Sequence, residues 1–484
     1  MKSVWLEEVN LHNRESLDEN IATEILIIGA GIAGVLIGYK LKEKGFNPII
    51  IDGYRSLKGN TAYTTAKITC QHDIIYSKII KEFGIDMAKQ YATANTLAID
   101  EYEKIIKEKN IKCNFERKPA YIYSRDNIEE IKKEFEASKS LGIDAELTTE
   151  VNLPFEVKAA LKFNNQAEFN PLAFLSEISK ELTIYENTRA LEIEEDTVLT
   201  NRGKIKAKHI IVATNFPFIN TPGYYFLKMH QERSYVLALE GAEDVKGMYI
   251  DVDKEGYSFR NYKNLLLLGG CSKRTGENEK GGCYERLREK AKELYPEAKE
   301  KYHWSNQDCM TIDEIPYIGR YSKSTPNIYV ATGFNKWGMT SAMVSAFIIS
   351  DMIVDKENDL KDIFSPTRFD LSASIKKLFV NGVETAKNFV EERVHIPLSF
   401  IEDVKLGEGK IIEYNNSKVG VFKEIDGRIF VVTTKCSHLG CELKWNKDDC
   451  CWECPCHGSR FNCMGEVLNG PAIKKISKEN AVFK

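Results

Sequence analysis

Two short segments near the end of the chain each place a cysteine and a histidine close together. They are Cys436-Ser437-His438-Leu439-Gly440-Cys441 and Cys454-Pro455-Cys456-His457-Gly458-Ser459. Two thiolates can bind one iron of a two-iron, two-sulfide cluster while two imidazoles bind the other, so each segment offers one ligand of each kind. Zinc takes the same ligand types and is the alternative metal, and a purely structural cysteine cluster is a further alternative. We favour iron because zinc sites rarely show two such matching halves.

A glycine-rich turn near the start of the chain has the spacing that binds a dinucleotide. Gly29-Ala30-Gly31-Ile32-Ala33-Gly34 follows an expected strand, 24–28, and opens an expected helix that ends near Lys44; Asp52 ends the next expected strand, 48–52. The first glycine allows a tight turn, the second lets the backbone approach a pyrophosphate, and the third lets helix and strand pack closely. Asp52 is expected to accept hydrogen bonds from ribose hydroxyls. A tight turn without a ligand is the alternative.

Four further segments resemble the FAD-dependent oxidoreductases of the D-amino-acid oxidase superfamily, the group of the glycine and sarcosine oxidases. They are Gly59-Asn60-Thr61-Ala62-Tyr63-Thr64-Thr65-Ala66-Lys67, Gln166-Ala167-Glu168-Phe169-Asn170-Pro171, Ala213-Thr214-Asn215, and a C-terminal set made of 313–319, 331–334 and 338–340. The resemblance runs from about 25 to 353 and implies bound FAD. The FAD-binding residues that it and the glycine-rich turn imply are Gly29, Gly31, Ile32, Ala33, Gly34, Asp52, Thr61, Thr64, Thr65, Ala66, Lys67, Ala213, Thr214, Gly333, Phe334, Gly338, Met339 and Thr340.

The two cysteine and histidine segments resemble the cluster loops of Rieske proteins, especially those of cytochrome bc complexes. The resemblance implies that Cys436 and Cys454 bind one iron and that His438 and His457 bind the other. It also implies a disulfide between Cys441 and Cys456 that joins the two loops, and a hydrogen bond from Ser459 to a bridging sulfide. High-potential members carry a tyrosine where this chain has Phe461, so a cluster potential in the lower half of the Rieske range is expected.

Five polar side chains are candidates for work at the flavin. Lys67 lies in the expected flavin loop, where a cation would stabilise the anionic reduced flavin; a surface lysine is the alternative. Arg260 would clamp a substrate carboxylate, and a structural ion pair is the alternative. His72 and His230 are possible acid or base groups, although each is expected to be a satisfied structural histidine. Cys309 lies near the position where some sarcosine oxidases attach flavin covalently, and a buried thiol is the alternative.

The element pattern predicts an α/β protein with a second, all-β part. We expect an FAD-binding, Rossmann-like three-layer domain with an interleaved mixed-sheet substrate domain, plus a small all-β Rieske domain. The expected units are an N-terminal extension, 1–22, the FAD-dependent oxidoreductase, 23–360, a helical connector, 361–397, and the Rieske domain, 398–484. Segment 74–139 has helical periodicity and is expected to be a solvated helical layer. Cys70, Cys113, Cys271, Cys283 and Cys309, like Cys450, Cys451 and Cys463, are expected to be ordinary thiols.

Composition narrows the class of protein. The chain has 484 residues, 43% of them hydrophobic, which is enough for two or three cores. Its formal net charge is −4 and its basic residues are spread along the chain, so no nucleic-acid partner is expected. No stretch approaches the ~20 apolar residues of a membrane helix, and the N-terminal residues lack the apolar centre of a signal peptide. A cytoplasmic protein is expected.

The family resemblance implies a reaction. In that superfamily FAD takes a hydride from a carbon next to an amine, which leaves an imine that hydrolyses. The sequence has no second glycine-rich strand–helix unit, which argues against an NAD(P)H site, and the cluster implies transfer of single electrons. We expect an amine or amino-acid dehydrogenase with a small-molecule substrate and a one-electron acceptor or donor protein. The alternatives are a reductase that runs in the reverse direction and a non-catalytic redox carrier or sensor.

Overall fold

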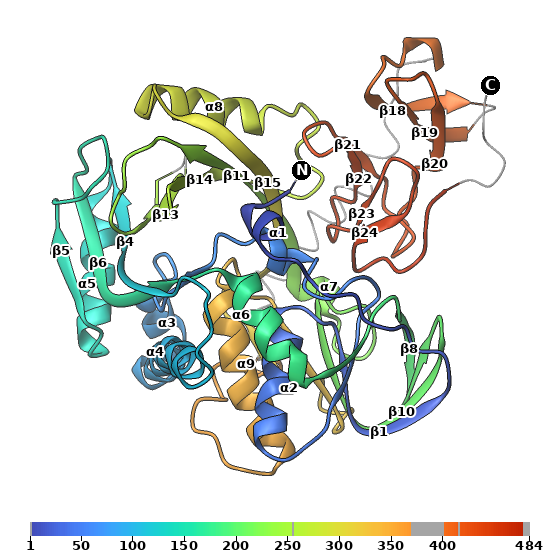
Figure 1. The fold of residues 1–484 in the computed structure, drawn as a ribbon, viewed down its shortest axis with the longest axis horizontal. Helices are drawn as coiled ribbons and strands as arrows, with labels where there is room; N and C mark the ends of the chain where they lie inside the picture. Colours follow the sequence, from blue (N-terminus) through green and yellow to red (C-terminus); the bar gives the residue numbers. More distant parts are fainter. Residues whose placement is uncertain (1, 254–255, 369–400, 415–416, 478–484) are drawn as a thin grey trace.

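The structure is a computed structural model that describes residues 2–253, 256–368, 401–414 and 417–477. It places them in a large body and a smaller lobe, which is coloured orange to red in Figure 1. The body holds the described residues up to 368, and the lobe holds those from 401 onward. Most of the expected helical connector, from 369 to 397, lies outside the described residues.

The first sheet of the body has eight strands in the order of a dinucleotide-binding domain. β1 (Ile21–Ile28) lies between β10 (Gly203–Asn215) and β2 (Ile49–Ile51), and all its pairings are parallel. The sheet also holds β7 (Thr183–Tyr185), β8 (Ala190–Glu194), β9 (Thr197–Thr200), β16 (Tyr317–Arg320) and β17 (Ile328–Thr332). α2 (Ile32–Glu43) and α9 (Gly338–Ile353) pack against each other beside this sheet (Figure 1). Parallel strands that are covered on both faces consist of continuous apolar residues, so their positions can be predicted from the sequence.

The second sheet of the body has nine strands and is mixed, as expected for a substrate domain. Its path is β15-β11-β14-β13-β12-β4-β6-β3, with β5 on β6 and with β12 parallel to β4. The bounds are β3 Lys67–Ile68, β4 Glu116–Ser124, β5 Ala145–Thr148, β6 Ala159–Glu168, β11 Met229–Glu240, β12 Met248–Asp251, β13 Ser258–Tyr262, β14 Leu265–Arg274 and β15 Lys299–Thr311. Further helices of the body are α6 (Pro171–Ile178), α7 (Tyr225–Lys228) and α8 (Cys283–Leu294), and it has 3-10 turns at Asn60–Tyr63 and Ser179–Glu181.

Two expectations about the body need correction. Segment 74–139 contains the helices α3 (Tyr76–Phe83), α4 (Ile85–Glu108) and most of α5 (Ile128–Ser140), but β4 interrupts them, because its aromatic and aliphatic end is buried in the second sheet. Residues 1–22 are not a separate extension. α1 (Val4–Glu8) buries Trp5 completely, and its indole nitrogen donates a hydrogen bond to the Thr64 carbonyl at 2.7 Å.

The lobe consists of two small antiparallel sheets. One holds β18 (Glu408–Tyr414), β19 (Ser417–Lys423) and β20 (Ile429–Thr433), preceded by a 3-10 turn at Ile401–Asp403. The other holds β21 (Lys444–Asn446), β22 (Cys451–Glu453), β23 (Arg460–Phe461) and β24 (Val467–Asn469). The lobe has its own apolar clusters, separate from the core of the body.

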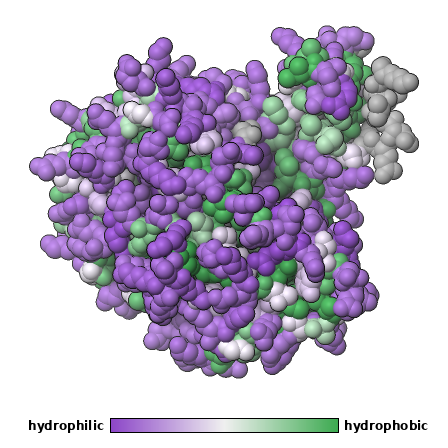
Figure 2. Space-filling model, in the orientation of Figure 1, coloured by the Kyte–Doolittle hydropathy of each residue, from purple (hydrophilic) through white to green (hydrophobic). Residues whose placement is uncertain are grey.

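The surface in view is mostly hydrophilic, with hydrophobic side chains gathered where the lobe meets the body (Figure 2). Among the described residues, no helix is both long enough and apolar enough to cross a membrane.

Candidate flavin and iron–sulfur sites

A cavity of about 500 Å³ opens beyond the carboxyl ends of β1, β2 and β10. Ligands of doubly wound sheets bind at such edges. The expected FAD residues that line it are Gly29, Gly31, Ile32, Ala33, Asp52, Thr61, Thr64, Ala213, Thr214, Phe334, Gly338 and Met339. The others, Gly34, Thr65, Ala66, Lys67, Gly333 and Thr340, are outside its lining. The cavity therefore gathers segments that lie hundreds of residues apart in the sequence.

The three glycines of the turn differ in what a side chain would meet. A Cβ at Gly29, where φ is +112°, would lie 2.4 Å from the Ala213 carbonyl oxygen. A Cβ at Gly34 would lie 1.9 Å from the carbonyl oxygen of Gly29. At Gly31 the nearest atom is the Thr61 hydroxyl at 3.4 Å, so this Cβ would point into the cavity. Two glycines thus serve the fold, and Gly31 leaves room for a ligand, which fits a pyrophosphate.

Asp52 holds the turn as well as lining the cavity. Its two carboxylate oxygens accept hydrogen bonds from the backbone N–H groups of Ala30 and Tyr54, each at 2.8 Å. Burial raises the pKa of this carboxyl, although both backbone donors favour its charged form. Each oxygen keeps a further lone pair for a ribose hydroxyl.

Arg260 does not face the cavity, which removes it as the expected substrate clamp. Its side chain is 1% exposed, and one terminal nitrogen donates to the carbonyls of Thr65 and Ala66, each at 2.7 Å. Its Nε also lies 3.3 Å from a carboxylate oxygen of Glu168. These contacts make it a structural ion pair that shapes the expected flavin loop, because the loop carbonyls need donors when buried.

Lys67 follows the loop that Arg260 supports. Burial lowers the pKa of its ammonium to about 7, and no ion pair or hydrogen bond engages it within the described part of the chain. The charged neighbours that act on it include Asp73 and Glu168, which favour its charged form. The ammonium is therefore poised to gain or lose a proton near neutral pH.

Two neighbouring strands place carboxylates on one face near the cavity. Glu232 on β11 pairs in register with Asp308 on β15, and Asp308 lines the cavity. Lys336 lies 2.8 Å from Glu232, whereas no ion pair engages Asp308 within the described ranges. Burial raises the pKa of Asp308 to about 6. This end of the cavity therefore offers an anionic group to a cationic ligand.

The two candidate histidines of the body have structural partners. His72 is 2% exposed and its ring nitrogens contact the Tyr91 hydroxyl at 2.6 Å and the Thr69 carbonyl at 2.8 Å. His230 Nε2 lies 3.4 Å from Glu232. Cys309 is a buried thiol that lines the cavity. The structure thus agrees with the structural alternative for His72.

The four expected cluster ligands come together in the lobe. Cys436 and Cys454 are buried and their thiols hydrogen-bond each other, which lowers the pKa of Cys436 to about 7. The rings of His438 and His457 lie 5.0 Å apart at 90°. The Nδ1 atoms of both rings are buried without a hydrogen-bond partner among the described residues. Two adjacent thiols and two unsatisfied imidazole nitrogens fit a cluster with mixed ligation.

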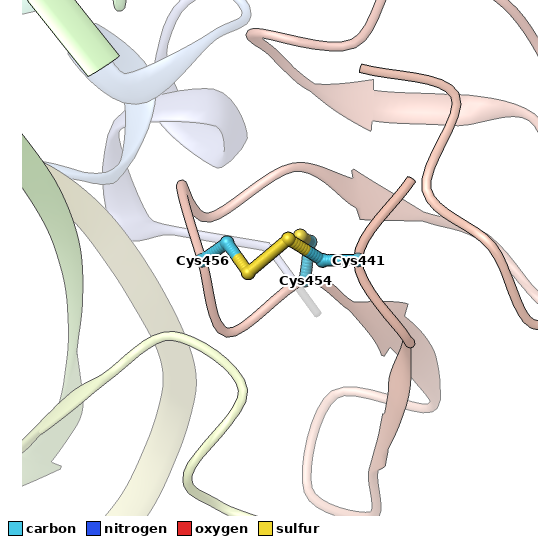
Figure 3. Close-up of side chains that lie close together, drawn as sticks. All are labelled: Cys441, Cys454 and Cys456. Atoms are coloured by element: carbon cyan, nitrogen blue, oxygen red, sulfur yellow. A yellow bond between two sulfur atoms is a disulfide. The ribbon is translucent and has the colours of Figure 1, made fainter. Parts of the chain in front are cut away.

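The loops that carry these ligands are joined by the disulfide between Cys441 and Cys456, as the family resemblance implied. Their sulfur atoms lie beside that of Cys454 (Figure 3). Ser459 is fully buried, and its hydroxyl accepts a hydrogen bond from the Ala472 backbone at 3.0 Å. A second disulfide joins Cys271 to Cys283, which corrects the expectation that both are isolated thiols. The sequence hides this pair because the two cysteines become neighbours only through the turn between β14 and α8.

The cluster loops face the body. The Nε2 atom of His438 lies 2.7 Å from the side-chain oxygen of Asn220, and the ring of Phe226 contacts the rings of both cluster histidines edge-on. Gln231 donates hydrogen bonds to the carbonyls of His457 and Gly470. None of these three body residues belongs to a motif, so no sequence signal indicated them.

The lobe also forms part of the flavin cavity. Its segment 467–473 lines the cavity together with the glycine-rich turn. The Tyr54 hydroxyl donates to the Val467 carbonyl, and Arg189 donates to the Ile473 carbonyl at 3.4 Å. A buried ion-pair network supports this contact, because Arg233 lies 2.5 Å from Asp449 of the lobe.

Comparisons with known proteins identify the two domains that carry these candidate sites. The chain matches the FAD dependent oxidoreductase family over residues 24–352 and the Rieske [2Fe-2S] domain over residues 395–480. The Rieske 2Fe-2S iron–sulfur protein YhfW of Bacillus subtilis (strain 168) is 38% identical over 494 residues, which cover 99% of this chain and 97% of that protein. Gamma-glutamylputrescine oxidoreductase of Escherichia coli (strain K12) is 21% identical over 374 residues, which cover 70% of this chain and 85% of that one.

Among solved structures, glycine oxidase from Geobacillus kaustophilus superposes with a TM-score of 0.62 at 17% identity, covering 72% of this chain and 99% of that one. This likeness shows a shared fold. The chain therefore belongs to the FAD-dependent oxidoreductase family and carries a C-terminal Rieske domain. Its cofactors are FAD and a Rieske 2Fe-2S cluster.

Proposed function

We propose that this oxidoreductase oxidises an amine or an amino acid at the flavin and passes the electrons singly through the cluster to an external one-electron acceptor. Both domains build one cavity, and this observation carries the proposal. Segment 467–473 of the Rieske domain and the glycine-rich turn of the FAD domain line the same space. Adjacent cofactor sites support direct exchange of electrons between the cofactors.

FAD accepts two electrons together and returns them one at a time, and the chain's own residues prepare it for this chemistry. Gly31 and the start of α2 would receive the pyrophosphate. Arg260 fixes the loop that ends at Lys67, and a Lys67 ammonium close to the flavin ring would favour negative charge on the reduced ring. Its pKa of about 7 lets it take up or release a proton during turnover.

An amine substrate is supported by the charges at the cavity. Asp308 presents a carboxylate that no described residue neutralises by an ion pair, and it attracts an ammonium group. The name of the E. coli relative contains an amine, putrescine, which agrees with this class. Asp308 lies on a strand that is paired with β11 along its length, so the sheet fixes the backbone position of its carboxylate.

The test is an anaerobic screen of amines and amino acids against the holoprotein. We expect at least one compound to bleach the flavin absorbance and, in the same sample, to produce the rhombic, low-average-g resonance of a reduced Rieske cluster. The His438→Ala variant is the matched control: the same compound should bleach its flavin without producing the resonance.

Two outcomes would contradict the proposal. If no amine or amino acid bleaches the flavin but a reduced one-electron donor does so through the cluster, the enzyme runs in the reverse direction. If substrates fail and the two cofactors only equilibrate with each other, the protein is a redox carrier or sensor.

A further inference from the structure

Two glutamine side chains of the body hold the Rieske loop that carries His457. Gln231 lies on β11 and Gln307 lies on β15, and both are almost fully buried. Gln231 Nε2 donates to the carbonyl of His457 at 2.7 Å, and Gln307 Nε2 donates to the carbonyl of Gly458 at 2.7 Å. Gln307 also donates to Gln231 Oε1 at 2.6 Å, so the two amides form one hydrogen-bonded unit.

The loop touches this unit without any side chain between them. Gly458 has a φ of +79°, and a Cβ on it would lie 2.5 Å from the Cβ of Gln231. A residue with a side chain would push the loop away from β11. The sequence motif that supplies the ligand His457 therefore also supplies the glycine that permits direct contact with the body.

Gln231 reaches the flavin cavity as well. It lines the cavity, and it pairs in register with Cys309 of β15, which lines the cavity too. Its amide also donates to the carbonyl of Gly470, another lining residue, at 2.9 Å. One buried side chain thus connects the wall of the flavin cavity to the backbone of a cluster ligand.

Within the described part of the chain, no hydrogen bond links the other cluster histidine to a residue of the cavity wall. His438 contacts Asn220, which does not line the cavity. Electron tunnelling between fixed cofactors weakens steeply with distance and is favoured by covalent and hydrogen bonds over gaps. By this criterion the route through Gln231 and His457 is more direct than a route through Asn220 and His438.

We propose that Gln231 and Gln307 are positioning residues that fix the electron-transfer contact between the flavin and the cluster. The inference rests on the proposed function. The anionic reduced flavin would give up its two electrons one at a time and release its single proton to solvent, while the other proton of the amine oxidation would leave from the substrate. The cluster would accept one electron at a time, which reduces one of its two ferric irons to ferrous iron, and would pass it to an external one-electron acceptor before the second electron arrives.

The experiment uses the full-length holoprotein and needs no substrate. A light pulse with EDTA as sacrificial donor reduces the bound flavin, and absorbance at the cluster bands follows arrival of the electron. We expect Gln231→Leu to slow this transfer at least tenfold when the rates are compared in protein loaded with FAD and iron to the wild-type level, and the midpoint potentials of both cofactors are measured to correct the rates for driving force. Asn220→Ala is the matched control and should slow it less than twofold.

Gln307→Leu is the second variant, because Gln307 supports the loop without lining the cavity. It should slow transfer in the same direction even if Gln231→Leu proves unstable. Wild-type transfer rates in fully loaded Gln231→Leu or Gln307→Leu protein would overturn the inference. Absence of any flavin-to-cluster transfer in the wild type would instead overturn the proposed function.

Discussion

The four proposed cluster ligands all lie between Cys436 and His457, whereas the residues that line the proposed flavin cavity run from Ile28 to Ile473. The first site is made by two loops of one small lobe, which are tied by a disulfide. The second is assembled from both sheets of the body and from the lobe itself. A site built from one short part of the chain tolerates changes elsewhere in the protein. A site built from distant parts of the chain is affected by any change that moves one of its lining segments. The cluster should therefore survive loss of the flavin, and the flavin should be sensitive to how the lobe is docked.

Loss of a cluster ligand is expected to give the largest effect. His438→Ala removes one imidazole of the mixed set and should abolish the cluster, seen as loss of iron and of the Rieske resonance. FAD per chain should stay close to the wild-type value, because His438 does not line the flavin cavity. The exposed His12→Ala serves as control and should keep both cofactors. Loss of FAD together with iron in His438→Ala would show that the two sites are not separable.

The reciprocal change is Gly31→Val. Its branched side chain would enter the space left for the pyrophosphate, and overpacking of this kind costs about 1–3 kcal/mol. We expect a folded protein with little FAD and a full complement of iron, measured by absorbance and metal analysis. Gly34→Ala provides the contrast, because its Cβ meets the Gly29 carbonyl at 1.9 Å and should destabilise the fold itself. Full FAD occupancy in Gly31→Val would refute this placement of the cofactor.

The interface between lobe and body can be weakened at Arg233. Its guanidinium is 4% exposed, lies 2.5 Å from Asp449 and lies 3.6 Å from Glu453, and removing one partner of a buried ion pair costs about 3–5 kcal/mol. Arg233→Met should lower the urea midpoint and weaken FAD binding while keeping the cluster. Arg288→Met, which removes an exposed pair with Glu300, should cost less than about 1 kcal/mol. Unchanged FAD affinity in Arg233→Met would mean that docking of the lobe does not shape the cavity.

The pKa of Lys67 predicts a pH effect on the flavin. Burial lowers this pKa to about 7, so the ammonium is charged below pH 7 and neutral above it. The charged form favours anionic reduced flavin, so its help is present at low pH and is lost as pH rises through 7. The flavin midpoint potential should therefore fall more steeply between pH 6 and 8 in the wild type than in Lys67→Met, as measured by redox titration. If the midpoint potential falls with pH at the same slope in the wild type and in Lys67→Met, Lys67 does not act on the flavin.

The smallest expected effect lies within the lobe. Phe461 is fully buried among the apolar residues around the cluster cysteines. Phe461→Tyr adds a donor towards the sulfur atoms, and a hydrogen bond of about 1 kcal/mol corresponds to roughly 40 mV for one electron. Voltammetry should find a wild-type potential in the lower half of the Rieske range and a rise in the variant, with no rise in Phe461→Leu. A potential near the top of the range would count against the missing donor.

Much of the fold could be predicted from the sequence because its signals are local. The apolar runs of β1, β2, β10 and β17, the spacing of the glycines and the acid at position 52 predict the dinucleotide-binding half. The helical periodicity of segment 74–139 hid β4, because the second half of this strand is buried without a break and so shows no alternation of polar and apolar residues. Trp5 gave no local sign that the first residues belong to the core.

The proposed cluster ligands could be predicted from the sequence alone, because their chemistry depends on residue types at close spacing. The candidates at the flavin were not. Arg260 has the residue type of a substrate clamp, yet its contacts with the Thr65 and Ala66 carbonyls make it structural, and only the packed structure shows which partner a guanidinium has.

The sequence by itself therefore determined the two cofactors and the family, because glycine spacing and cysteine–histidine spacing are properties of short segments. Only the tertiary structure decided that segment 467–473 closes the flavin cavity and that Gln231 meets His457. Both are contacts between residues far apart in the chain, and such contacts are set by how the lobe docks on the β11–β15 edge of the second sheet. Docking depends on the shape and charge of whole surfaces, which no short stretch of sequence carries.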